Sequence, residues 1–299
     1  MKTKFLIYGH KGWIGSMLCR ILELQKIDYV KAWSRANNPS DVEKEIGTVS
    51  PTHIFSCIGR THGTTSTGKS YSTIDYLEEK ETLSENIQDN LYSPLVLAIL
   101  SSKFNIHLSY LGTGCIFEFD ESHKPHMKGF TENDLPNFFG SSYSTVKGFT
   151  DQLLHLFEDE CLNLRIRMPI TDQVHARNFI TKITTYDRIC SMANSMSVLD
   201  DLLPIAIDMA LNRITGTINL TNPGSISHNE ILKMYKEIVN PNFSWKNFSI
   251  EEQAAILQSG RSNNYLETTK LQTLYPSVLP IHKSVENALY RMKNDFTEK

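Results

Sequence analysis

The strongest constraint on the fold is a glycine loop between a strand pattern and a helix pattern at the N-terminus. An apolar run at residues 4–8 is typical of a buried strand, and Ile14 begins a segment with helical apolar spacing. Between the two patterns glycine recurs at every third position, as Gly9, Gly12 and Gly15. Such glycines let the backbone turn tightly and approach a pyrophosphate, whose charge the helix N-terminus stabilises. The sequence therefore predicts a nucleotide-binding unit, against the alternative of a tight turn without a ligand.

The rest of the chain continues the alternation of strands with helices. Further strands are expected at 29–33, 53–59, 106–111, 162–168 and 217–220. This rhythm predicts an α/β protein with a doubly wound parallel sheet of the Rossmann type, over residues 1–170 with residues 200–221 returning to it. Segments 171–199 and 222–299 carry mostly helical patterns and should form a smaller substrate-binding lobe. The irregular segment 118–142 is long enough to be a functional lid.

Ser34 and Arg35 come directly after the second predicted strand. A fold of this kind usually places an acidic side chain there to bind the adenosine ribose of NAD, whereas serine and arginine can receive the 2′-phosphate of NADP. We therefore expect residues 1–170 to bind NADPH, with NADH as the alternative and a merely solvated Arg35 as the competing interpretation. The other expected cofactor contacts lie at strand ends and in the first helical turn, and they are Gly9, Gly12, Trp13, Ile14, Gly15, Cys57, Ile58, Gly59 and Pro169.

Tyr143 and Lys147 stand four residues apart at the start of a helical pattern, so both side chains should leave the same face of one helix. A phenol has a reference pKa of about 10 and is a poor acid at neutral pH, but a neighbouring ammonium group lowers that pKa. An isolated pair of this spacing is usually an ordinary surface pair. Behind a nucleotide fold it indicates proton transfer beside a cofactor, and both residues then also join the predicted cofactor contacts.

The apolar run at residues 106–111 leads to Thr113 and Cys115. Alternation along an extended strand end would aim both side chains toward one side of the sheet. A free thiol has a reference pKa of about 8.5, which is within reach of neutrality if a cation lowers it. Cys115 is therefore either a reactive thiol or a small buried hydrophobic residue.

Polar residues that are expected to face the substrate lie in loops outside the sheet. Thr61 and His62 follow the third predicted strand, at the edge where open α/β sheets bind ligands. Asn178 belongs to the segment that interrupts the strand and helix rhythm. Arg261 and Asn263 form a candidate phosphate clamp, because arginine offers a forked donor. The competing interpretation is that His62 and Arg261 are solvated loop residues.

Composition argues against several classes of protein. The formal net charge is −3 and no basic tract stands out, which argues against nucleic acid as a partner. The longest apolar runs fall short of the roughly 20 residues of a membrane helix, so we expect a soluble, cytoplasmic protein without a membrane partner. The 5 cysteines contain no CxxC pair, which argues against a disulfide framework and against a metal site.

Several stretches spread along nearly the whole chain carry a resemblance to one enzyme family, and they are FLIYGHKGWIG, GTGCIFEFD, LPNFFGSSYSTVK, RIRMPI, RNFITKI, TNPGSISHNEILKMY and RSNN. They are similar to the bifunctional 3,5-epimerase/4-reductases that complete UDP-L-rhamnose synthesis in plants and some giant viruses, within the extended short-chain dehydrogenase/reductases. The resemblance implies conversion of a nucleotide-linked 4-keto-6-deoxyglucose to the L-rhamnose nucleotide. UDP is favoured as the carrier, with dTDP as the alternative.

The resemblance also implies roles for individual residues. For the reduction at carbon 4 with NADPH, Tyr143 would donate the proton, Lys147 would lower its pKa and bind the nicotinamide ribose, and Thr113 would hydrogen-bond the developing alkoxide. Inversion of carbons 3 and 5 requires a base and an acid on opposite faces, because both hydrogens are α to the carbonyl. Cys115 is the candidate base. Lys182 lies where related enzymes place the acid, sometimes as a histidine, and a solvated charge is its competing interpretation.

Partners follow from the same resemblance. The sequence shows no second nucleotide fold, so a separate 4,6-dehydratase would supply the 4-keto sugar, and relatives commonly pair as homodimers through the helices that carry the Tyr143 motif. Three other functions stay open at this point. They are a single-function nucleotide-sugar 4-reductase, a 4-epimerase, and a catalytically silent subunit that binds NADPH and regulates another enzyme.

Overall fold

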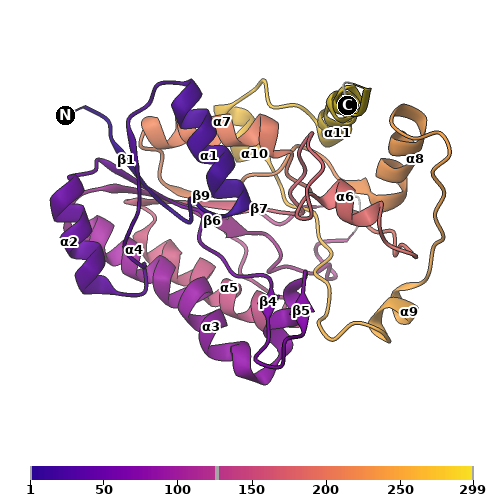
Figure 1. Ribbon diagram of the computed structural model, residues 1–299, viewed down its shortest axis with the longest axis horizontal. Helices are drawn as coiled ribbons and strands as arrows, with labels where there is room; N and C mark the ends of the chain where they lie inside the picture. The colour runs from indigo at the N-terminus through magenta and orange to yellow at the C-terminus, as the bar shows by residue number, and fades with distance from the viewer. Residues whose placement is uncertain (1, 125–127, 298–299) are drawn as a thin grey trace.

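A six-stranded parallel sheet forms the centre of the protein in the computed structural model, which describes residues 2–124 and 128–297 (Figure 1). The strand order across the sheet is β2-β1-β3-β6-β7-β9. The strands are β1 (Phe5–Tyr8), β2 (Tyr29–Lys31), β3 (His53–Ser56), β6 (His107–Thr113), β7 (Cys161–Ile166) and β9 (Gly216–Asn219). The chain moves outward from β1 to β2 and then in the other direction from β3 to β9, so the switch point lies between β1 and β3. The predicted doubly wound α/β fold is confirmed.

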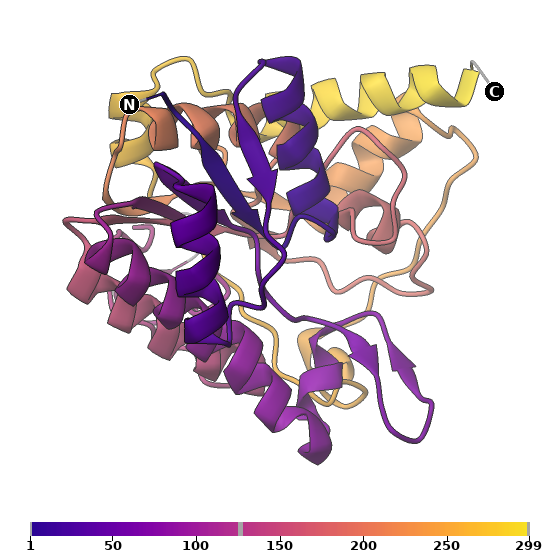
Figure 2. The ribbon, with the colours of Figure 1, turned by 60° about the vertical axis from the view of Figure 1, so that its left-hand side comes forward.

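Helices cover both faces of this sheet. The longer ones are α1 (Trp13–Leu24), α2 (Pro39–Val49), α4 (Ser93–Lys103), α5 (Ser142–Leu154), α7 (Leu199–Leu211), α8 (His228–Ile238) and α11 (Ile281–Thr297). In both views α1 and α7 lie on one side of the sheet and α4 and α5 on the other (Figures 1 and 2). Phe5 and Ile7 join the apolar cluster beneath α1, whereas Leu6 and Tyr8 join the cluster beneath α2 and α4. Successive side chains of one strand thus anchor opposite helix layers.

A second lobe surrounds an apolar core of its own, which includes Ile170, Ile180, Ile231 and Leu289. Besides α8 and α11 it contains α6 (Phe179–Ile183) and α9 (Ile250–Ala254), while α10 (Thr269–Leu274) packs against β9. Two short strands that were not expected, β8 (Ala193–Asn194) and β10 (Ile226–Ser227), pair antiparallel in this lobe. The exact boundaries between the two domains stay a prediction. No helix in the described part of the chain is long and apolar enough to cross a bilayer.

Some local expectations are wrong. β3 ends at Ser56 rather than at Gly59, and a small hairpin of β4 (Gly63–Thr64) and β5 (Ser70–Tyr71) follows it. Segment 118–142 is not a free lid where it is described, because Phe130 exchanges backbone hydrogen bonds of 2.8 Å with residues 265 and 267. Residues 125–127 of that segment lie outside the described residues. The remaining short elements are η1 (Ile74–Glu78), η2 (Lys80–Thr82), α3 (Leu83–Ile87), the π-helical η3 (Gln88–Tyr92) and η4 (His155–Phe157).

Two buried arginines alternate with apolar residues at the end of β7, Arg165 inside the strand and Arg167 just beyond it. The Arg165 side chain faces α5, where Nε and Nη2 donate to the Asp151 carboxylate at 2.9 and 2.6 Å. Its third nitrogen, Nη1, donates to the carbonyl oxygen of Thr131 at 3.1 Å. Asn163 adds a hydrogen bond of 2.8 Å to the same carboxylate. This two-point ion pair fixes α5, which carries Tyr143, against the centre of the sheet.

Asp151→Asn should therefore destabilise the fold strongly. The substitution keeps the shape of the side chain but leaves the Arg165 guanidinium buried without a counter-charge, which costs about 3–5 kcal/mol. Chemical denaturation monitored by circular dichroism measures the loss. The matched control is Glu43→Gln, which breaks the exposed pair with Lys103 and should cost less than about 1 kcal/mol. Equal losses for the two variants would contradict the structural role given to Asp151.

Candidate active site

The glycine loop brings the ends of β1 and β3 together at the switch point. Gly9 has a left-handed backbone with φ 75°, and a Cβ there would lie 2.8 Å from the carbonyl carbon of Cys57. A Cβ on Gly15 would lie 2.1 Å from the carbonyl oxygen of Gly9. Gly12 begins α1 without a side-chain cap, so the helix N-terminus can offer its N–H groups to an anion. The loop thus fits the pyrophosphate of a dinucleotide.

The second lobe reaches across to this loop. The indole of Trp13 stacks on the imidazole of His175, with 5.1 Å between the ring centroids and 3° between the planes. Arg177 donates Nη1 to the hydroxyl of Thr61 at 3.3 Å. Segment 171–178 therefore lies against both the glycine loop and the loop after β3, so that cofactor-side and substrate-side residues share one cleft.

Ser34 and Arg35, the two residues predicted to bind the 2′-phosphate, have different environments in the structure. Ser34 donates both its N–H, at 3.1 Å, and its hydroxyl to the carboxylate of Glu45, which is fully buried. The N–H of Trp33 and the hydroxyl of Tyr8 also donate to Glu45, at 2.6 and 2.8 Å. Both donors of Ser34 are used inside the protein, and its role as a phosphate ligand stays a prediction. Arg35 is exposed, so its guanidinium is the group that remains for a 2′-phosphate.

Tyr143 lies at the start of α5 and faces the end of β6. The buried hydroxyl of Thr113 accepts a hydrogen bond from the N–H of Cys115 at 3.0 Å and hydrogen-bonds the Tyr143 phenol. Burial raises the pKa of Tyr143, the negative form of Cys115 raises it further, and the bond from Thr113 acts in the opposite direction. The phenol is therefore held in its protonated form, as a proton donor must be.

Lys147 follows one helical turn later and is also buried. Its ammonium donates to the hydroxyl of Tyr110 and lies 4.6 Å from the centroid of that ring. Burial lowers the pKa of Lys147 to about 8, while the negative charges of Asp151 and Cys115 act in the opposite direction. The ammonium group is therefore charged at neutral pH and loses its proton in mildly alkaline solution.

Cys115 lies near Tyr143 and Lys147, but the backbone conformation that places it there is not the predicted one. β6 ends at Thr113 and Cys115 lies in the turn that follows, so the argument from strand alternation is wrong. The turn nevertheless brings the partly exposed thiol to the predicted neighbours, because its negative form acts on the pKa of both Tyr143 and Lys147. It also acts on the pKa of Arg167, a buried residue beyond β7 that sequence reasoning missed.

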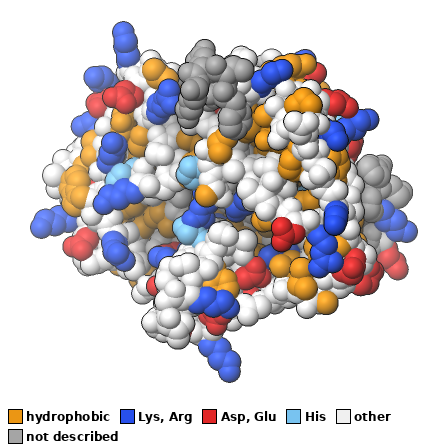
Figure 3. All heavy atoms as spheres, turned by 45° about the vertical axis from the view of Figure 1, so that its right-hand side comes forward, with side chains coloured by type: hydrophobic (Ala, Val, Ile, Leu, Met, Phe, Trp, Pro, Cys, Tyr) orange, Lys and Arg blue, Asp and Glu red, His pale blue; other side chains and the backbone are white. Residues whose placement is uncertain are grey.

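Lys182 belongs to a group of cations on the substrate side of the cleft. Burial lowers the pKa of Lys182, and the charges of Arg177 and Arg261 lower it further. Burial also lowers the pKa of His62 to about 4, with the neighbouring cations, first Arg177, adding to the effect. Figure 3 shows basic and histidine side chains gathered in a hollow across the middle of one face. Positive charge concentrated in this way suits a diphosphate group.

The other predicted substrate contacts already have partners inside the protein. Asn178 is buried and its amide caps α6, so we assign it a structural role. Arg261 pairs with Asp75 at 2.8 Å, which leaves less of its fork for a phosphate. The amide oxygen of Asn263 accepts a hydrogen bond of 3.0 Å from Asn194.

Asn90 positions the cofactor side of the site, and sequence reasoning missed this role. It lies in the π-helical turn η3, and its amide accepts from the N–H of Arg60 and donates to the carbonyl oxygen of Arg60, both at 2.9 Å. It also donates to Asn86 at 2.8 Å, which in turn donates to Ser142 at the start of α5 at 2.9 Å. These bonds fix the loop after β3 relative to α5. Buried asparagines within a helical pattern were the available signal.

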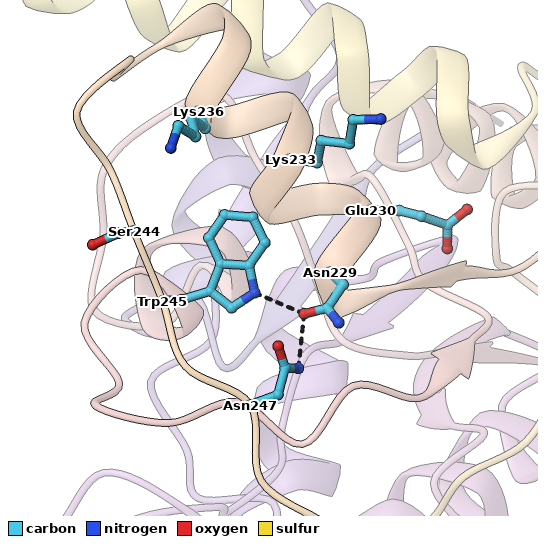
Figure 4. A pocket seen from close by; sticks show the side chains of 7 residues that line it. All are labelled: Asn229, Glu230, Lys233, Lys236, Ser244, Trp245 and Asn247. Carbon is cyan, nitrogen blue, oxygen red and sulfur yellow. Dashed lines mark hydrogen bonds between the residues drawn. The ribbon is translucent and has the colours of Figure 1, made fainter.

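A separate surface groove of about 530 Å³ lies beside α8 and contains none of the predicted site residues (Figure 4). The indole N–H of Trp245 and the amide of Asn247 both donate to the side-chain oxygen of Asn229, at 2.8 and 2.9 Å. The polar groups of the groove thus pair with one another, and we assign it no part in the chemistry. Among the described residues no group of histidine, cysteine and carboxylate side chains could hold a metal ion.

Comparison with known proteins finds relatives that align with almost the whole chain. The crystal structure of the L780 UDP-rhamnose synthase from Acanthamoeba polyphaga mimivirus has a TM-score of 0.93 at 56% identity, over 97% of this chain and 100% of that one. A bifunctional dTDP-4-dehydrorhamnose 3,5-epimerase/dTDP-4-dehydrorhamnose reductase from Arabidopsis thaliana is 42% identical over 283 residues, which are 94% of this chain and 90% of that protein.

A longer relative shows where such a module can occur. The trifunctional UDP-glucose 4,6-dehydratase/UDP-4-keto-6-deoxy-D-glucose 3,5-epimerase/UDP-4-keto-L-rhamnose-reductase RHM1 of Arabidopsis thaliana is 42% identical over 96% of this chain, which spans 42% of that protein. No family model matches the chain. From the relatives that align over almost the whole sequence, the chain belongs to the family of bifunctional nucleotide-rhamnose 3,5-epimerase/4-reductases, with the extended short-chain dehydrogenase/reductase fold.

Proposed function

We propose that this enzyme converts UDP-4-keto-6-deoxyglucose to UDP-L-rhamnose with NADPH, by epimerisation at carbons 3 and 5 followed by reduction at carbon 4. The observation that carries the proposal is that Thr113 and Cys115 both act on Tyr143 and that Cys115 also acts on Lys147. UDP is favoured over dTDP, because the mimivirus UDP-rhamnose synthase shares 56% identity, against 42% for the Arabidopsis enzyme named for dTDP sugars.

The reductive half uses the proton donor on α5. When bound, NADPH supplies the hydride for carbon 4. Tyr143 gives its proton to the oxygen at that carbon, and the Thr113 hydroxyl hydrogen-bonds the same oxygen as negative charge develops. The Lys147 ammonium stabilises the tyrosinate that is left, and solvent returns the proton after release of the product.

The epimerising half uses the thiol and the half-buried amine. The Cys115 thiolate takes the proton from carbon 3 or 5, and the electrons of that C–H bond pass into the enolate of the 4-ketone. The Lys182 ammonium then gives a proton to the opposite face of the same carbon, and thiol and amine return to their starting forms by exchange with solvent. The lowered pKa of Lys182 makes its ammonium a stronger acid than an exposed lysine.

We place NADPH in the cleft with its pyrophosphate on Gly9, Gly12 and Gly15 and its 2′-phosphate on Arg35. We assign the substrate diphosphate to the cations Arg177 and Arg261 on the other side. This arrangement puts the sugar between the two charged ends, where the pocket at the end of β6 lies.

We also propose that a separate 4,6-dehydratase supplies the substrate and that two copies pair through α4 and α5. The supply is supported by the Arabidopsis relative whose name includes that dehydratase activity. Pairing is supported by exposed apolar side chains on the two helices, since Ile99 and Phe149 are 55% and 51% exposed. The 5 cysteines are all free, which suits the reducing cytoplasm that we propose for the reaction.

Single substitutions should impair epimerisation and reduction independently of each other. With NADPH withheld in heavy water, wild type should exchange the hydrogens at carbons 3 and 5 of the 4-keto-6-deoxyglucose nucleotide, followed by NMR. Cys115→Ala should lose at least about a hundredfold in exchange rate, because it removes the base, yet still reduce pre-epimerised 4-keto-L-rhamnose nucleotide with stoichiometric NADPH oxidation. Tyr143→Phe should show the reverse pattern, and Cys190→Ala serves as the thiol control. Full exchange by Cys115→Ala would remove the thiol from the mechanism.

Reduction should weaken in alkaline solution. Because burial disfavours the charged form of Lys147 and brings its pKa to about 8, the ammonium is lost as the pH rises through that value, and with it the stabilisation of the tyrosinate. We expect kcat/KM for the pre-epimerised ketone to fall above about pH 8, as this parameter reports the free enzyme. Lys147→Arg keeps a charge at all working pH values and should move the fall to higher pH. An unmoved alkaline limb in that variant would exclude Lys147 as its origin.

Arg35 should decide between the two nicotinamide cofactors. Arg35→Ala removes a charged donor to the 2′-phosphate, a contact of about 1.5–3 kcal/mol, so the KM for NADPH should rise roughly tenfold or more. The KM for NADH, which lacks the phosphate, should stay within about twofold. Lys44→Ala, on the exposed side of α2, controls for the lost charge. Parallel changes for NADPH and NADH in Arg35→Ala would place the 2′-phosphate elsewhere.

A further inference from the structure

Arg167 is a buried cation that meets only neutral acceptors. It is 1% exposed and lies just beyond β7, where the chain passes into the second lobe. Nη1 donates to the side-chain oxygens of Asn194 and Asn264 at 3.0 and 2.9 Å, and Nη2 donates to the carbonyl oxygen of Ser262 at 2.7 Å. Within residues 2–124 and 128–297 no carboxylate pairs with this guanidinium. A buried charge without a counter-ion is costly, so its retention requires a reason.

Arg165, two residues earlier and inside β7, provides the comparison. Its guanidinium is equally buried but is neutralised by Asp151 at 2.6 Å. No carboxylate among the described residues neutralises the Arg167 guanidinium, so its positive charge can stabilise a negative group beside it. The two guanidinium groups are thus equally buried, but Arg165 is paired with a carboxylate and Arg167 is bonded to neutral acceptors.

The free side of Arg167 faces the turn that contains Cys115. Its Nε is buried and has no hydrogen-bond partner. A Cβ on Gly114 would lie 3.0 Å from both Cγ and Cδ of Arg167, so the arginine stem passes directly beside the residue that precedes the thiol. Burial lowers the pKa of Arg167, and the group that raises it is Cys115. The unpartnered donor and the thiol therefore belong to one local arrangement.

We propose that Arg167 is a positioning residue that holds Cys115 as the thiolate base of the epimerisation, with the unpartnered Nε as the donor available to the charged Sγ. The inference rests on the proposed function of Cys115. The other titratable groups that face the thiol are Tyr143 and Lys147 on α5, and the Lys147 ammonium is already bonded to Tyr110. Arginine keeps its proton at every working pH, so Arg167 stabilises a thiolate without supplying the proton that the thiolate must take from carbon.

Alkylation of Cys115 measures this effect directly. The full-length protein is treated with iodoacetamide from pH 5.5 to 10, and the rate at Cys115 is followed by peptide mass spectrometry. Arg167→Lys should move the midpoint of the rate profile to higher pH by about one unit, because the fixed donor beside Sγ is lost. The matched control is Arg165→Lys, which alters an equally buried arginine two residues earlier and should leave the midpoint in place.

A second variant keeps Arg167 itself intact. Asn194→Asp gives the guanidinium the carboxylate that it lacks, so the midpoint should again move to higher pH while the free energy of unfolding stays equal or increases. If Arg167 had only a structural role, Asn194→Asp would not raise the midpoint of alkylation while keeping or increasing the free energy of unfolding. An unmoved midpoint in Asn194→Asp overturns the proposal, whether or not Arg167→Lys folds.

The same variants separate this inference from the proposed function. If both hold, Arg167→Lys loses about tenfold in exchange at carbons 3 and 5 at pH 7 and retains reduction of the pre-epimerised ketone. If Cys115→Ala retains full exchange, the function proposed for the thiol fails, while the alkylation midpoint still decides whether Arg167 stabilises the thiolate. Loss of exchange and reduction together in Arg167→Lys, with an unmoved midpoint, would indicate a structural role.

Discussion

The ion pair between Arg165 and Asp151 joins the centre of β7 to α5 inside the protein, with side chains that are 0% and 5% exposed. Because Asp151 follows Lys147 by one helical turn, the pair sets the depth at which the Tyr143 and Lys147 side chains meet the end of β6. The same carboxylate also moderates the loss of positive charge on Lys147. In our proposal the fold and the chemistry of the reductive half therefore depend on one buried contact.

The next arginine on the chain joins the two lobes. Arg167 is bonded to Asn194, Ser262 and Asn264 of the second lobe and lies beside the turn that carries Cys115. Epimerisation needs a base whose position relative to the sugar does not vary, and in our proposal the lobe that binds the sugar also holds the base. In this proposal the end of β7 and the residue just beyond it support both reactions, through a neutralised arginine for reduction and a charged one for epimerisation.

Local patterns predicted much of this protein. The apolar run, the glycine loop and the helical spacing at the N-terminus led to the doubly wound sheet, because steric limits at Gly9 and Gly15 act between residues close in sequence. Tyr143 and Lys147 were paired correctly on one helix face for the same reason. Where the argument depended on an assumed local conformation, as in the alternation from Thr113 to Cys115, it was wrong, since the strand ends before the thiol.

By itself the sequence determined the order of strands and helices, the glycine loop and the spacing of Tyr143 and Lys147, since each depends on neighbours within a few residues. The tertiary structure alone decided which charges are neutralised. Glu45 takes both donors of Ser34, Asp75 pairs with Arg261, and Arg167 is left without a carboxylate among the residues that the structure describes. These outcomes depend on residues far apart along the chain that packing brings together in a medium of low dielectric constant, where the presence or absence of one counter-charge sets the chemistry of a site.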